Sequence, residues 1–419
     1  EAEGPADENG AKEGLDEDSN LYVPYDQVPW HREGDLVTVP GGKQAGQKPS
    51  STVVKTQPLA LPPLLRLHNE LLDFCDLLAP TRAELEARQK VTRISADTVK
   101  KLWPSFDVHV FGSEATKVFL PDSDIDMVVL PPTDLPLHQI RKNLFTLAEA
   151  FKQEESVSGM EIISQARVPI VKLRFQNLQV DISFSSDSGL KSARYMLEKM
   201  EAMPPLRPLI LVLKYFLAQR ELNQTYMGGC GSFLLQLMVI AYLQHAQKEA
   251  DKASRSERTR NLGSLFLGFL RFYGHQFNYE EVGISVLGEG ILFRKMERGM
   301  YQHDRPDILA MENPLDPSVD VGKNSYNLPV LKVALAQAYT RLHTALVAPP
   351  DGPPFSLLAL AIRPDRVLAA RPMPKRFIFQ TRVFSSRRQI PEAADRAGGG
   401  QGPVVKGEEG RVMYSPPSQ

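Results

Sequence analysis

The pairing of Gly112-Ser113 with Asp124 and Asp126 constrains this chain more than any other feature of its sequence. Gly112 follows a short apolar run, and a glycine there lets the backbone turn sharply and approach a ligand. Ser113 then opens a predicted helix, whose free N–H groups and dipole favour an anion. Asp126 leads into a second apolar run, residues 127–130, which indicates a buried strand. The pattern predicts a phosphate cradle beside a pair of carboxylates.

The two carboxylates suggest a divalent cation. Asp124 and Asp126 are two residues apart, so on extended backbone they point to the same face. Such neighbours repel unless a cation neutralises them, and beside a phosphate cradle that cation is most simply Mg²⁺ shared with a nucleotide. A solvated acidic turn is the plainer alternative, because Asp and Ser are ordinary turn residues. A calcium loop is excluded, since Met127 and Thr133 occupy the positions that need Gly and Glu.

Asp181 adds a third carboxylate. Residues 168–175 and 179–184 are apolar-rich and are separated by three residues, which predicts a β-hairpin. Asp181 alternates with the apolar residues of the second segment and therefore faces away from them. If this strand lies beside the strand that follows Asp126, three carboxylates converge, which is a ligand set for two divalent ions. Taken alone, Asp181 would be an ordinary solvent-facing residue.

These motifs resemble the DNA polymerase β-type nucleotidyltransferase superfamily, whose pattern is Gly-Ser, a spacer, Asp-x-Asp and a distant Asp. Over about residues 60–370 the chain is similar to the poly(A) polymerase subunit of the TRAMP RNA-surveillance complex. The similarity lies in Pro80–Glu86, Leu102–Pro104, Phe111–Asp126, Leu213–Leu217, Leu222–Asn223, Gly228–Phe233 and Pro314–Tyr326. It implies an α+β fold, in which a small mixed α/β nucleotidyltransferase (polymerase β-like palm) domain joins an all-helical central domain across a nucleotide cleft.

The resemblance also implies an activity. It is the template-independent addition of AMP from ATP to RNA 3′ ends, with two Mg²⁺ (or Mn²⁺) ions, in nuclear RNA surveillance and exosome-mediated decay. Asp124, Asp126 and Asp181 would hold the metals, and Asp181 is the best candidate for the general base. An RNA uridylyltransferase or other nucleotidyltransferase, and a non-catalytic scaffold of an RNA-decay complex, are the alternatives. The intact set of three Asp residues speaks against the scaffold.

The resemblance assigns further residues to the nucleotide. From its own surroundings Lys214 is a solvated lysine beside an apolar helix stripe, whereas the resemblance implies that it contacts the triphosphate together with Ser113. It also implies that Ser232 contacts the nucleotide, that Phe233 stacks on the incoming base and that Gly189 lies near the ribose. Stacking is worth ~1–3 kcal/mol for any base, so it does not select adenine.

Base choice is expected to come from residues 314–326, the family's nucleotide recognition motif. The family usually has Asn-Asp-Val-Gly-Arg, and this chain has Val319 in place of the Asn and Lys323 in place of the Arg. Val319 lacks an amide that can read a base edge, and Lys323 replaces a planar guanidinium with a point charge. We therefore expect Asp320 and Lys323 to set the ratio of ATP to UTP use, and the departure puts strict ATP preference in doubt.

The charge balance indicates that partners supply RNA affinity. The chain has 49 Lys and Arg against 50 Asp and Glu, which argues against tight unaided RNA binding. No zinc knuckle or other RNA-binding motif is visible in the sequence. The resemblance implies a zinc-knuckle RNA-binding protein and an RNA helicase as partners in a TRAMP-like complex, located in the nucleoplasm or nucleolus.

Two other composition features exclude classes of protein. Cys75 and Cys230 are the two cysteines and both lie in apolar runs, so we expect neither a disulfide framework nor a zinc site. No apolar run is long enough to cross a membrane, so no membrane association is expected.

Composition and periodicity divide the chain into five regions. Thr81 and Glu84 form a predicted capping box that starts a helix running to about Leu102. Leu21–Trp30 is an aromatic island in a polar tail and is our candidate dock for the helicase. The regions are a disordered N-terminal tail with this possible docking motif (1–57), helices packing with the central domain (58–103), the catalytic domain (104–190), the helical central domain (191–370) and a basic, then disordered C-terminal tail (371–419).

Overall fold

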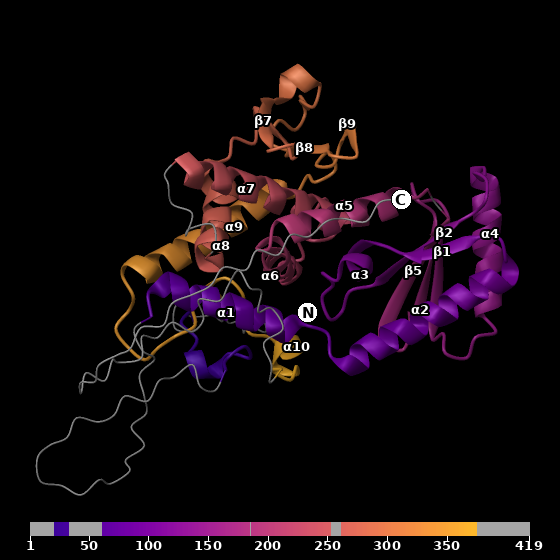
Figure 1. Cartoon of the computed structure of the whole chain (residues 1–419), viewed down its shortest axis with the longest axis horizontal. Coiled ribbons are helices and arrows are strands. Elements are labelled where there is room, and N and C mark those ends of the chain that lie inside the picture. Colours follow the sequence, from indigo (N-terminus) through magenta and orange to yellow (C-terminus); the bar gives the residue numbers. More distant parts are fainter. Residues whose placement is uncertain (1–20, 33–60, 185, 253–260, 375–419) are drawn as a thin grey trace, which may run out of the picture. The chain divides into compact units, whose positions relative to one another are not determined.

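The structure, a computed structural model, describes residues 21–32, 61–184, 186–252 and 261–374 (Figure 1). All of them belong to one compact unit, Glu1–Phe384, and a second unit, Ser385–Gln419, contains no described residue. The predicted C-terminal tail beyond residue 374 therefore lies outside the described residues, as do residues 1–20 and 33–57 of the predicted N-terminal tail.

The catalytic domain is built on a five-stranded sheet, which is preceded by helix α2 (Arg82–Leu102). The predicted capping box starts α2: Thr81 Oγ1 accepts from the Glu84 amide at 3.2 Å, and the Thr81 amide donates to Glu84 Oε2 at 2.6 Å. The sheet has the order β1-β2-β5-β4-β3. Its strands are β1 (Asp107–Val110), β2 (Ile125–Leu130), β3 (Gly159–Ile163), β4 (Ile170–Phe175) and β5 (Leu178–Phe184).

The pairing of these strands determines where the acidic side chains lie. β2 and β5 are parallel neighbours, while β4 and β5 form the predicted antiparallel hairpin. The apolar side chains of the sheet share a buried cluster with residues of α2 and of α4 (Leu137–Phe151). Because side chains alternate across a strand, the residues between those apolar positions lie on the other face of the sheet. That open face is where the three Asp residues lie.

The central domain is largely helical and includes α1, the first α-helix among the described residues. Helix α1 (Pro63–Leu78) packs against α6 (Leu206–Ala218) and α8 (Leu262–Arg271). The prediction that residues 58–103 as a whole pack with the central domain is wrong for α2, because its apolar side chains Val91 and Val99 join the buried cluster of the catalytic sheet. None of the described helices combines the length and hydrophobicity needed to cross a membrane. The other α-helices are α5 (Ser188–Ala202), α6 (Leu206–Ala218), α7 (Ser232–Lys252), α8 (Leu262–Arg271), α9 (Leu328–Val347) and α10 (Arg366–Ala369).

A second sheet in the central domain was not predicted. The α+β fold class is confirmed, but the central domain is not all-helical. Its four strands are only four or five residues long, and the two edge strands are mostly exposed, so neither length nor alternation reveals them in the sequence. The order is β7-β6-β8-β9, with β6 (Val282–Ser285), β7 (Ile291–Arg294), β8 (Ala310–Asn313) and β9 (Asp316–Asp320).

The aromatic island near the N-terminus packs on its own chain. Trp30 is fully buried, with its ring edge-on to Phe74 of α1 at 5.3 Å between centroids. Arg32 forms ion pairs with Asp73 at 2.7 Å and with Asp76 at 2.6 Å. The prediction of a disordered tail is therefore wrong for residues 21–32, and Trp30 is not free to dock a helicase. The physical reason is that the indole fills the helical core while α1 supplies the counter-charges for Arg32.

Candidate active site

The sheet brings three carboxylates together on its open face. Asp126 on β2 is the direct cross-strand partner of Asp181 on β5, so the expectation that these strands are neighbours is confirmed. Asp124 immediately precedes β2 and is linked to Asp181 by the side-chain amide of Gln179. The amide nitrogen lies 3.1 Å from Asp124 Oδ2 and 3.3 Å from Asp181 Oδ1.

The surroundings of Asp124 and Asp126 disfavour the ionised form of both carboxyl groups. Burial, and then the charges of Asp181 and Asp124, raise the pKa of Asp126 to about 6. Burial and the charge of Asp181 also raise the pKa of Asp124. Oxygen donors that are buried and mutually repulsive have the chemistry of a Mg²⁺ or Mn²⁺ site. Within the described residues, however, no three acidic, His or Cys side chains already surround a common point, so the three must rearrange slightly to share an ion.

Gly112 allows the backbone to pass beside Asp126. Its φ is +60°, in the left-handed region, and a Cβ at this position would lie 2.5 Å from Asp126 Oδ2. The neighbouring Phe111 amide donates to the Asp126 carbonyl at 3.0 Å, which fixes the approach. Helix α3 (Gly112–Thr116) follows directly, as the sequence predicted. A glycine is thus required at position 112 for two independent reasons: the backbone is in the left-handed region, and Asp126 leaves no room for a Cβ.

A cavity of about 580 Å³ opens between the catalytic domain and helices α6 and α7. Five of the predicted residues line it: Ser113, Asp124, Asp126, Lys214 and Ser232. The solvated interpretation of Lys214 is wrong, because its side chain is buried and its Nζ donates to the Val118 carbonyl at 2.9 Å. Burial lowers the pKa of Lys214 to about 8. The cavity thus combines carboxylates at one wall with a buried ammonium at another.

The remaining predicted nucleotide residues lie outside the lining of this cavity. Phe233 is half-buried and packs against the core of the central domain. Asp320 Oδ1 accepts from the amides of Met311 at 2.9 Å and Gly322 at 2.8 Å, so this carboxylate holds its own loop together. Lys323 is exposed. Gly189 packs against the ring of Phe111, and a Cβ at Gly189 would lie 2.6 Å from that ring. In this structure Gly189 therefore serves close packing.

The recognition loop is nevertheless tied to the glycine-rich loop that precedes α7. The Asn327 side chain donates to the Met227 carbonyl at 2.6 Å, and the Asn327 amide donates to the Gly228 carbonyl at 2.8 Å. A Cβ at Gly228 would lie 2.4 Å from the ring of Tyr326. Residues 314–326 therefore connect to the segment that places Ser232 and Phe233.

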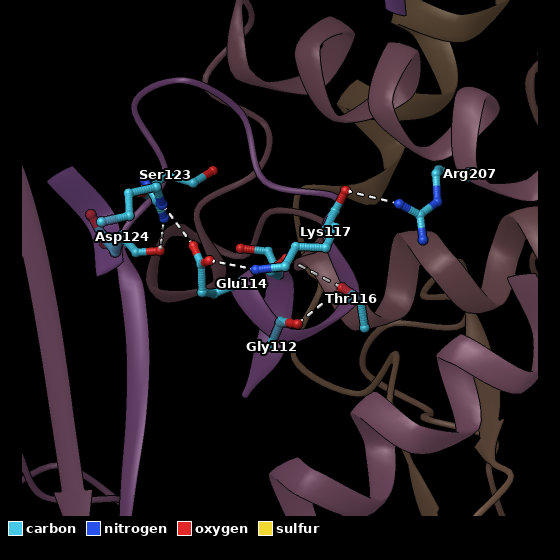
Figure 2. A network of polar contacts seen from close by, with 9 residues as sticks. Gly112, Glu114, Thr116, Lys117, Ser123, Asp124 and Arg207 are labelled. Carbon is cyan, nitrogen blue, oxygen red and sulfur yellow. Dashed lines mark hydrogen bonds and ion pairs between the residues drawn. The ribbon is translucent and has the colours of Figure 1, made fainter. Parts of the chain in front are cut away.

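Sequence reasoning missed a buried ion pair that supports the Asp124 segment. Arg88 of α2 donates from Nε to Glu114 Oε2 at 2.6 Å and from its other nitrogens to the carbonyls of Ser123 at 2.9 Å and Asp124 at 3.2 Å. Lys117 adds a second ion pair to Glu114 at 2.8 Å. Figure 2 shows this network beside Asp124. No local pattern in the sequence indicates it, because its members come from three segments.

We expect Arg88→Met to lower the free energy of unfolding by about 3–5 kcal/mol, because it leaves the buried Glu114 carboxylate without its main partner. Urea denaturation at neutral pH measures the change. The double variant Arg88→Met/Glu114→Gln removes the uncompensated charge and should recover most of the lost stability. Equal losses in the single and double variants would show that packing of the Arg88 side chain, and not its charge, is what matters.

Comparison with known proteins finds similar families, a similar solved structure and similar curated proteins. Residues 67–197 match the family described as poly(A) RNA polymerase, mitochondrial-like, central palm domain, and residues 261–319 match the Cid1 family poly A polymerase description. A solved structure of the polymerase core of TRAMP, described as an RNA surveillance complex, is similar with a TM-score of 0.65 and 31% identity, covering 72% of this chain and 94% of that one.

Two curated relatives show the range of this similarity. Poly(A) RNA polymerase cid14 of Schizosaccharomyces pombe is 35% identical over 284 residues, which are 67% of this chain and 41% of that protein. Trf4-2 of Drosophila melanogaster, named as an inactive poly(A) RNA polymerase, is 31% identical over 67% of this chain and 69% of its own length. The chain spans 41%, 37% and 47% of the lengths of the first three curated relatives it matches.

Proposed function

The chain belongs to the Cid1 family of poly(A) polymerases, which are nucleotidyltransferases, and from that premise we propose that it adds AMP from ATP to RNA 3′ ends. The observation that supports this most strongly is the cross-strand placement of Asp126 beside Asp181, with Asp124 and Asp126 lining the cavity that also contains Lys214. A scaffold without activity would need none of these groups. Although Trf4-2 is named as inactive, the three Asp residues of this chain are intact and adjacent.

In the proposed reaction the RNA 3′-hydroxyl oxygen forms a bond to the α-phosphorus of ATP, and the bond to the departing pyrophosphate breaks. Asp181 accepts the proton of the hydroxyl, while Ser113 and Lys214 hold the triphosphate. Asp124 and Asp126 would be shared by two Mg²⁺ or Mn²⁺ ions, and Asp181 would complete the set for one of them. Such ions, when bound, make the hydroxyl more acidic and stabilise the charge on the leaving oxygen.

We further propose that the chain acts in a TRAMP-like complex in the nucleus, in RNA surveillance, non-coding RNA processing and exosome-mediated decay. The near balance of 49 basic and 50 acidic residues supports a need for partners, because phosphate neutralisation by Lys and Arg supplies most sequence-independent RNA affinity. A zinc-knuckle RNA-binding protein and an RNA helicase would provide that surface. Such partners raise tailing through effective concentration without changing the chemistry.

The proposed activity is tested with purified chain, Mg²⁺, a short RNA primer and each of the four NTPs in separate reactions. We expect extension with ATP in preference to UTP, GTP and CTP, and short products unless a zinc-knuckle partner is added. Gel analysis of labelled primer gives the nucleotide added and the tail length. Preferential use of UTP would identify a uridylyltransferase instead, and no extension with any NTP, at saturating Mg²⁺ and with the partner, would favour the scaffold.

A further inference from the structure

A row of four charged residues crosses the open face of the catalytic sheet. The strand register places Glu161 of β3 opposite Lys172 of β4, Lys172 opposite Asp181 of β5, and Asp181 opposite Asp126 of β2. Lys172 therefore lies between two acidic residues on neighbouring strands, one inside the active site and one outside it. Directly opposite residues on a sheet have Cβ atoms about 4.5–5.5 Å apart, so their side chains are close enough for their charges to interact.

Lys172 is bound to the active-site side of this row. Its Nζ lies 2.9 Å from Asp181 Oδ2, and the two side chains are only 28% and 16% exposed. The other oxygen of the same carboxylate accepts from Gln179 at 3.3 Å. Both oxygens of Asp181 are therefore engaged within the protein. A divalent ion that uses Asp181 must compete with a monovalent cation already bound to it.

We propose that Lys172 is a built-in counter-cation of the active site, which neutralises Asp181 before metal binding and must move away when Asp181 joins a divalent ion. Glu161, on the far side of Lys172, is the group that can receive the released ammonium. The ion pair with Lys172 explains how Asp181 is accommodated beside two other carboxylates in the folded chain. The proposal rests on the proposed function only in taking the three Asp residues as metal ligands.

Two other roles for Lys172 predict different results. As an ordinary cross-strand pair it would contribute about 0.2–1 kcal/mol to stability and would not affect metal binding. As an RNA phosphate contact it would affect RNA affinity but not metal affinity in the absence of RNA. If it merely positioned Asp181, its removal would weaken metal binding, whereas a competing cation predicts that its removal strengthens it.

The test is the affinity of the full chain for Mn²⁺, measured by electron paramagnetic resonance without RNA or nucleotide. We expect Lys172→Met to tighten Mn²⁺ binding on the order of tenfold, since a unit charge in contact with Asp181 is removed. Lys172→Gln, which keeps a donor but no charge, should behave likewise and serves if the Met variant does not fold. Lys172→Arg should stay near wild type, and Glu161→Gln should weaken Mn²⁺ binding.

Control variants make the result specific. Lys191→Met removes the same charge from an exposed pair, between Lys191 on α5 and Asp187 just before that helix, and should leave Mn²⁺ affinity unchanged. Asp124→Asn should abolish the binding, which shows that the measured ion is at this site. Unchanged or weaker Mn²⁺ affinity in both Lys172→Met and Lys172→Gln would overturn the proposal. Because the titration contains no RNA or NTP, its outcome is independent of whether the chain proves to extend RNA with ATP.

Discussion

Replacing Asp124 or Asp126 by alanine is expected to reduce AMP addition more than a hundredfold. Both carboxylates line the cavity, and loss of a metal ligand removes several kcal/mol of transition-state stabilisation, where a hundredfold corresponds to about 2.7 kcal/mol. Single-turnover primer extension at saturating ATP measures the effect. Asp107→Ala, at an exposed position on β1, is the control and should keep wild-type activity.

Removing the charge of Asp126 should not harm the fold. The pKa of Asp126 is raised by burial and by its acidic neighbours, so at pH 7 the ionised carboxylate costs folding free energy. Asp126→Asn is therefore expected to unfold at a higher temperature than wild type when EDTA is present. Loss of activity together with gain of stability would identify a functional site that is strained by its own charges. An Asp124→Ala variant that kept more than about a hundredth of the wild-type rate would refute the metal assignment.

Gly112→Ala is expected to lower the rate of AMP addition on the order of a hundredfold without unfolding the protein. The new methyl group would lie 2.5 Å from Asp126 Oδ2 and must displace that carboxylate. A displacement of about 1 Å at reacting groups is sufficient for a loss of this size. The positive φ adds about 1–2 kcal/mol of backbone strain. Primer extension and thermal unfolding, measured on the same preparation, separate the two effects.

Gly288→Ala provides the matched control. Gly288 has φ of +57°, almost the value at Gly112, but a Cβ there would meet nothing within 4 Å. Both variants should therefore lose similar stability, and only Gly112→Ala should lose activity. Equal activity in the two variants would mean that Asp126 accommodates the methyl group and that the close approach has no catalytic role.

The local features of the site were predictable because each depends on residues close together in sequence. Gly112 begins helix α3, and Asp181 alternates with apolar neighbours along one strand, as periodicity alone indicated. The capping box of α2 needs only Thr81 and Glu84, three residues apart, and forms as predicted. In these cases the backbone conformation of a few residues decides the direction of a side chain, so tertiary packing has little left to determine.

The features that the sequence did not reveal depend instead on residues that are far apart in sequence. The four strands between Val282 and Asp320 are short, and their pairing rather than their own pattern makes them a sheet. Trp30 belongs to a short aromatic island within a tail of polar composition, and it is buried because α1 offers both apolar contacts and the partners of Arg32. The amino-acid composition of a tail is an average over many residues, so it does not reveal that one side chain in it is buried.

The sequence by itself determined the α+β class and the positions of Gly112 and of the three Asp residues. It also determined the strand faces to which the Asp side chains point. Only the tertiary structure decided that β5 lies beside β2, that Lys214 is buried in the cavity wall, and that Lys172 forms an ion pair with Asp181. The physical reason is range. Helix and strand periodicity act over a few residues, whereas a desolvated charge depends on partners that the fold brings from distant segments.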